Sequence, residues 1–122
     1  MKKILLADDS ETMRLFIRIF MRNLSDVRVT EAADGFDAIE KIRKEDFDLI
    51  ITDINMPHMD GLQLIRSIRG MGLATPIIVL STRGEETEIE KGLSLGANDY
   101  MTKPISGHRF TSTVMTYIGT AV

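Results

Sequence analysis

Acidic and basic residues stand at the ends of three short apolar runs. Asp8 and Asp9 follow a run of isoleucine and leucine, Asp53 closes a second such run, and Lys103 comes shortly after a third. Each run has the character of a buried strand. In an open parallel α/β sheet the carboxyl ends of the strands meet at one edge, where ligands bind. We therefore expect three carboxylates and one ammonium group to come together there.

Three clustered carboxylates need a counter-charge, because two of them about 4 Å apart repel by roughly 4 kcal/mol at an effective dielectric constant of 20. Hard oxygen ligands with no nearby histidine or cysteine favour Mg²⁺ over zinc. A metal beside an exposed carboxylate suggests an aspartate nucleophile for phosphoryl transfer. Lys103 would place a second positive charge on the transferred group. Ser81, at the end of a further apolar run, would offer a hydroxyl donor.

The elements that must position these residues alternate between short apolar runs and longer amphipathic stretches. Strands are predicted at 5–7, 27–32, 49–52, 77–80 and 99–101, the second of them near an edge because it is less apolar. Five β-α units predict a parallel sheet with helices on both faces and right-handed crossovers. The apolar stripes of the helices are predicted at Met13, Phe16, Ile17, Phe20, Met21 and Leu24, at Phe36, Ile39 and Ile42, at Leu62, Ile65 and Ile68 after an Asp60 N-cap, within 85–95, and at Phe110, Val114, Tyr117 and Ile118.

Size and composition limit the function classes. A chain of 122 residues predicts one domain, 1–122, with a core that needs no staples. The absence of cysteine excludes disulfides and thiolate chemistry, and a net charge of −3 gives no argument for a nucleic-acid or membrane partner. No apolar run is long enough to cross a bilayer, and no signal peptide is evident. We expect a soluble, cytoplasmic monomer whose initiating Met1 favours a natural start.

Seven short motifs occur in order along the chain. They are LADDS (6–10), ADG (33–35), DINMP (53–57), MDG (59–61), LST (80–82), GA (96–97) and KP (103–104). As an ordered set they resemble the receiver domain of bacterial two-component response regulators, most of all the stand-alone chemotaxis type, over essentially the whole length. The resemblance implies a flavodoxin-like (βα)5 fold with strand order 2-1-3-4-5.

The resemblance also implies roles for individual residues. Asp53 would accept a phosphoryl group from the phosphohistidine of a sensor histidine kinase, which makes the protein a phospho-accepting switch and not an enzyme. Asp9 and Asp53 would bind Mg²⁺ directly, Asn55 would contribute its backbone carbonyl, and Asp8 would act mainly through a water. Lys103 would pair with the acyl phosphate, and the peptide bond after Lys103 is expected to be cis.

The same resemblance implies a conformational switch. Ser81 would move toward the phosphoryl group and Tyr100 would turn inward, which repacks the face made by the fourth helix, the fifth strand and the fifth helix. A downstream protein would bind that face, in chemotaxis or motility-type signalling, and a phosphatase would be a further partner. We also hypothesise that Arg83, with Asn55 and Met56, tunes the phosphate lifetime by controlling water access.

Other readings of the sequence remain open. A phosphatase of the haloacid dehalogenase type needs a second aspartate two residues after its nucleophile, and Asn55 stands there. A flavin carrier would need a glycine-rich phosphate loop where Asp8 and Asp9 stand. A phosphorylation-independent scaffold, a phosphate sink in a relay, and a receiver cut from a larger protein are the remaining alternatives. Within residues 1–122 we expect no DNA-binding segment.

Overall fold

The fold is a parallel five-stranded sheet with order β2-β1-β3-β4-β5, covered by helices on both faces. In the computed structural model, residues 1–82 and 84–119 are described. The strands are β1 (Lys2–Ala7), β2 (Val27–Ala32), β3 (Leu49–Asp53), β4 (Ile77–Ser81) and β5 (Asp99–Thr102). The helices are α1 (Glu11–Met21), α2 (Gly35–Lys44), α3 (Gly61–Gly70), α4 (Glu86–Leu95) and α5 (Gly107–Ile118). The predicted flavodoxin-like order and the edge position of β2 are confirmed.

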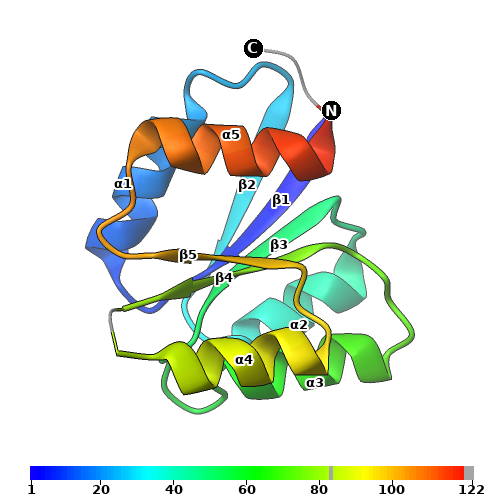
Figure 1. Ribbon diagram of the computed structural model, residues 1–122. Coiled ribbons are helices and arrows are strands. Elements are labelled where there is room, and N and C mark those ends of the chain that lie inside the picture. The colour runs from blue at the N-terminus through cyan, green and yellow to red at the C-terminus, as the bar shows by residue number, and fades with distance from the viewer. Residues whose placement is uncertain (83, 120–122) are drawn as a thin grey trace.

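The sheet separates two hydrophobic cores, because successive side chains of a strand point to opposite faces. Figure 1 shows α1 and α5 on one face and α2, α3 and α4 on the other. In β1, Ile4 and Leu6 pack in the α1–α5 core, whereas Leu5 and Ala7 pack in the core under the other helices. All four are fully buried, which explains why this strand is continuously apolar from Ile4 to Ala7. Full burial stabilises each large aliphatic side chain by about 1.5–3 kcal/mol.

Polar caps fix where the helices begin. Ser10, Asp34, Asp60 and Ser106 each accept a hydrogen bond from a backbone N–H in the first turn of α1, α2, α3 and α5 respectively. Asp60 is the N-cap that the sequence predicts, and Gln63 completes a capping box with it. These caps hold the loops that follow β1, β2, β3 and β5, so they position the carboxyl edge of the sheet.

Several details of the predicted stripes are wrong. Phe16 and Phe36 are 48% and 56% exposed, and Ala38 is the fully buried residue in the first turns of α2. In α3 the core side chains are Leu64, Ile65 and Ile68, while Leu62 lies only half-buried at the edge of that face. Helical spacing places residues on a face, but the neighbouring elements decide how wide a stripe is covered.

No helix in residues 1–82 and 84–119 is long and apolar enough to cross a membrane.

Candidate functional site

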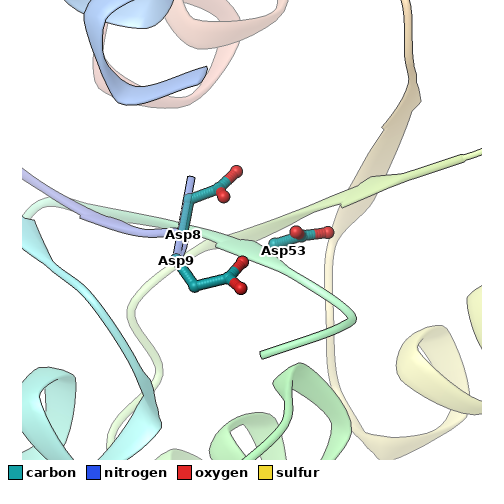
Figure 2. A group of neighbouring side chains, drawn as sticks. All are labelled: Asp8, Asp9 and Asp53. Carbon is teal, nitrogen blue, oxygen red and sulfur yellow. The ribbon is translucent and has the colours of Figure 1, made fainter. Parts of the chain in front are cut away.

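Three acidic side chains converge at the carboxyl edge of the sheet. The register between β1 and β3 pairs Ala7 with Thr52. The residues that follow these two, Asp8 and Asp53, therefore lie side by side. Asp9 follows in the loop to α1, and one carboxylate oxygen from each of the three acids lies within 4.8 Å of the others. Figure 2 shows the three carboxyl groups pointing to the same side of these strand ends.

Lys103 provides the positive charge beside this cluster. Its Nζ lies 3.3 Å from Asp53 Oδ2 and 3.6 Å from Asp8 Oδ2. The backbone N–H of Lys103 donates to the carbonyl of Ser81 at 2.7 Å, which holds the start of the β5–α5 loop against β4. The Lys103–Pro104 peptide bond is cis, as the sequence resemblance implies. The structure thus brings together the four charged residues that the sequence places at strand ends.

Burial makes the two inner carboxylates costly to ionise. Asp8 is fully buried and Asp53 is 6% exposed, whereas Asp9 is exposed. Loss of hydration is the largest cause that raises the pKa of both Asp8 and Asp53, and for Asp53 the charge of Asp8 raises the pKa further. Lys103 acts on both pKa values in the opposite direction. One ammonium therefore compensates the cluster only in part, so the site favours an additional cation.

The loop after β3 is held tightly behind Asp53. The Ile54 N–H donates to the Leu80 carbonyl at 3.2 Å, and the Gly61 N–H donates to the Ile54 carbonyl at 2.8 Å. A Cβ at Gly61 would lie 2.2 Å from the backbone oxygen of Asp53. Only glycine leaves room for this approach, so the start of α3 packs directly under the backbone of Asp53.

Two further residues predicted to belong to the site, Ser81 and Asn55, lie at the end of β4 and just after the end of β3. Ser81 is the last residue of β4 and is fully buried. Its Oγ has no hydrogen-bond partner among the described residues. Asn55 is exposed two residues after Asp53, and its side-chain amide donates to the Glu85 carboxylate.

Sequence reasoning missed Glu85. Its carboxylate also accepts from the backbone N–H and the hydroxyl of Thr82, the hydroxyl at 2.7 Å. Partial burial acts to raise the pKa of Glu85, but the hydrogen bonds from Thr82 and Asn55, together with the charge of Lys103, lower it overall. A glutamate at the start of an acidic helix gives no signal of such contacts, because acids are common there for their effect on the helix dipole.

The family model of the response regulator receiver domain matches residues 4–115. The chain belongs to this family. Receiver domains are the phosphoacceptor switches of two-component signalling, and they act as signalling modules and not as conventional enzymes. Their interactions are with sensor histidine kinases and with downstream targets.

Individual relatives of this receiver domain come from several kinds of protein. It is 43% identical over 103 residues to the sensor protein EvgS of Escherichia coli K12, covering 84% of this chain and 8% of that protein. It superposes on the chemotaxis protein CheY4 of Vibrio cholerae with a TM-score of 0.87 and 31% identity, covering 96% of this chain and 98% of that protein. It also superposes on the receiver domain of the sensor histidine kinase PA1611 of Pseudomonas aeruginosa PAO1, a structure with a coordinated magnesium ion, with a TM-score of 0.87 and 32% identity. That superposition covers 97% of this chain and 98% of the other. The chain spans less than half of the length of the curated relatives it matches.

The acidic cluster of the receiver domain has the chemistry of a Mg²⁺ site. Asp8, Asp9 and Asp53 offer hard carboxylate oxygens at short mutual distances. Asp8 Oδ2 is buried and has no hydrogen-bond partner among residues 1–82 and 84–119, although Lys103 lies within ion-pair distance. A donor set that is all oxygen and short of positive charge fits a hard divalent cation.

Two further sequence expectations concern residues around the site. Tyr100 lies on β5 and is 38% exposed, so its ring is outside the two cores. Arg83, for which a role in phosphate lifetime is predicted, lies outside the described residues.

Proposed function

We propose that Asp53 is the phosphoacceptor of this receiver domain and that a sensor histidine kinase is the donor. The observation that carries the proposal is the position of its carboxylate. Asp53 Oδ2 lies 3.3 Å from Lys103 Nζ, and its carboxyl group faces two further acids within 4.8 Å. This arrangement provides a nucleophile, a fixed cation and ligands for a second cation at one strand end.

The transfer needs little from the protein besides positioning and charge neutralisation. A carboxylate oxygen of Asp53 forms the new bond to phosphorus while the P–N bond to the donor imidazole breaks, and the imidazole leaves with that electron pair. The Lys103 ammonium stabilises the negative charge on the transferred group. Asp8, Asp9, Asp53 and the backbone carbonyl of Asn55 would hold Mg²⁺, which when bound neutralises the charge of the acids and of the incoming phosphoryl oxygens.

We propose Ser81 and Tyr100 as the switch that responds to the new charge. Ser81 Oγ is buried without a hydrogen-bond partner among the described residues, so a phosphoryl oxygen on Asp53 offers it the acceptor that it lacks. Movement of Ser81 vacates space near β5, into which Tyr100 turns. The surface formed by α4, β5 and α5 then changes, and with it the affinity for a downstream protein.

The comparisons support two candidate outputs. The fit to a chemotaxis protein over nearly the whole of both chains supports signalling by protein contact in chemotaxis or motility. The similarity to a sensor protein and to the receiver domain of a sensor histidine kinase favours, as a second candidate, a relay role within a phosphotransfer chain. In both cases the proposed unit is a receiver domain over residues 1–122.

The test is phosphorylation with acetyl phosphate, followed by intact mass. The wild type is expected to gain one phosphoryl group in the presence of Mg²⁺ and none in EDTA. Asp53→Asn is expected to gain none. Asp46→Asn, an exposed change of the same charge on the loop before β3, is the matched control and should behave as the wild type. Absence of the adduct in the wild type at excess Mg²⁺ with several acyl phosphates would leave only the phosphorylation-independent scaffold.

A further inference from the structure

Glu85 stands at the N-cap position of α4, yet its side chain does not cap that helix. The carboxylate turns back to accept hydrogen bonds from the N–H and the hydroxyl of Thr82, and it reaches across to the side-chain amide of Asn55. It thereby joins the loop after β3 to the loop after β4. Because the Glu85 carboxylate makes these contacts, it does not give α4 the stabilisation that an N-cap side chain usually provides.

This bridge lies beside the residues proposed to carry the reaction. Asn55 comes two residues after Asp53, and Thr82 comes directly after Ser81. β3 and β4 are neighbours, with Asp53 paired to Leu80. Glu85 is therefore a fourth acidic group at this edge of the sheet. Lys103, which already faces Asp8 and Asp53, also acts electrostatically on Glu85.

We propose that Glu85 is a positioning residue that slows phosphorylation of Asp53 by holding the two loops in the unphosphorylated arrangement; this inference rests on the proposed function. A phosphoryl group adds roughly 1.5 to 2 negative charges. Those charges repel the Glu85 carboxylate across the same edge and compete with it for Lys103. The bridge to Asn55 and Thr82 must loosen as the charge on Asp53 develops.

Release of the bridge also links the reaction to the switch. The Glu85 carboxylate holds Thr82 through both its N–H and its hydroxyl, and Thr82 follows Ser81 directly in the chain. While Glu85 holds Thr82, the end of β4 is fixed and Ser81 is kept from moving toward Asp53. The same contact that opposes the incoming charge therefore delays the movement by which Ser81 responds.

Two substitutions separate the charge of Glu85 from its role as a tether. Glu85→Gln keeps a side-chain acceptor of the same shape but removes the charge, and Glu85→Ala removes both. Glu86→Gln is the matched control, because Glu86 is exposed in the first turn of α4 and the substitution changes the net charge equally. Glu85 and Glu86 lie outside both cores, so all three variants are expected to fold.

The measurement is the initial rate of phosphoryl adduct formation from acetyl phosphate with saturating Mg²⁺, at low salt and at about 1 M salt. Removal of one anion near a dianionic donor predicts a rate about fivefold higher for Glu85→Gln at low salt. The gain should shrink at high salt, where the Debye length falls from about 10 Å to about 3 Å. Glu86→Gln should stay close to the wild type in both conditions. This salt dependence is a readout that a purely structural tether would not produce.

A second readout follows the tether itself by NMR. The Thr82 amide resonance should shift when the wild type is phosphorylated, and Glu85→Ala should show much of that shift before phosphorylation. Equal rates for wild type and Glu85→Gln, or a slower rate for Glu85→Gln, would overturn the inference while the proposed function stands. A wild type that forms no adduct would instead overturn the proposed function, so the two failures are distinct.

Discussion

Replacing Asp53 by asparagine should stabilise the metal-free protein, although the change removes an ion pair. The pairwise charges nearly cancel at an effective dielectric constant of about 20. Asp8, at most 4.8 Å away, repels Asp53 by about 3.5 kcal/mol, and the exposed, more screened Asp9 adds roughly half of that. Lys103, at 3.3 Å, attracts Asp53 by about 5 kcal/mol.

Burial therefore decides the sign. Asp53 is only 6% exposed, and burial of an ionised group costs several kcal/mol of hydration free energy. The raised pKa of Asp53, with burial as its largest cause, points the same way. Since an amide of the same shape carries a much smaller cost, we expect Asp53→Asn to gain about 2 kcal/mol in free energy of unfolding. For a domain of 122 residues that corresponds to roughly 8 °C in Tm.

The pH dependence of this gain has a definite sign. An acid whose pKa is raised by folding is easier to ionise in the unfolded chain, so the wild type loses stability as pH rises from the ordinary value of 3.8 to the raised folded value. At lower pH, Asp53 is protonated and neutral like asparagine. The difference between wild type and Asp53→Asn should therefore be largest at neutral pH and should vanish in acid.

The assay is urea unfolding in EDTA at several pH values, repeated with Mg²⁺. Asp46→Asn serves as the control for the change in net charge. Mg²⁺ should stabilise the wild type by mass action and have little effect on Asp53→Asn. A variant that is less stable than the wild type at neutral pH in EDTA would show that the Lys103 pair outweighs burial, and the reasoning would fail.

Three other changes test separate parts of the structure. Arg69→Lys should cost about 2 kcal/mol in urea unfolding, because the guanidinium donates to several carbonyls between α3, β4 and the end of α4 that an ammonium cannot reach together. Gly61→Ala should lower the free energy of unfolding by more than about 2 kcal/mol and should lower the phosphorylation rate, because the added Cβ meets the Asp53 carbonyl. Gly70→Ala in the same helix is the control: its Cβ meets nothing within 4 Å, so the free energy of unfolding should rise by about 0.5 kcal/mol. Ser81→Ala should change the free energy of unfolding by no more than about 1 kcal/mol, because Ser81 Oγ has no hydrogen-bond partner among the described residues. This variant should still accept a phosphoryl group, but the NMR shifts that phosphorylation causes on the α4–β5–α5 face should be lost. Shifts that persist would remove Ser81 from the switch.

The sequence by itself determined the class of fold and the types of residue at the site. Continuous apolar runs such as that of β1 identify buried parallel strands, and the polar residues that close them identify the edge where ligands bind. The Asp60 cap and the edge position of β2 were likewise predicted, because capping and the apolar content of a strand depend on residues close in the chain. The ordered motifs were sufficient to place the chain among receiver domains before any distance was known.

Only the tertiary structure decided the distances and the pairwise contacts among these groups. The pairing of Ala7 with Thr52 sets Asp8 beside Asp53, and the packing of β5 brings Lys103 to both of them. The exposure of Phe16 and Phe36 depends on how far neighbouring helices extend over a face, which local spacing does not encode. The bridge from Glu85 to Asn55 joins positions 30 residues apart. Short-range patterns determine what each segment is, whereas contacts between distant segments depend on register and packing, which arise only when the whole chain folds.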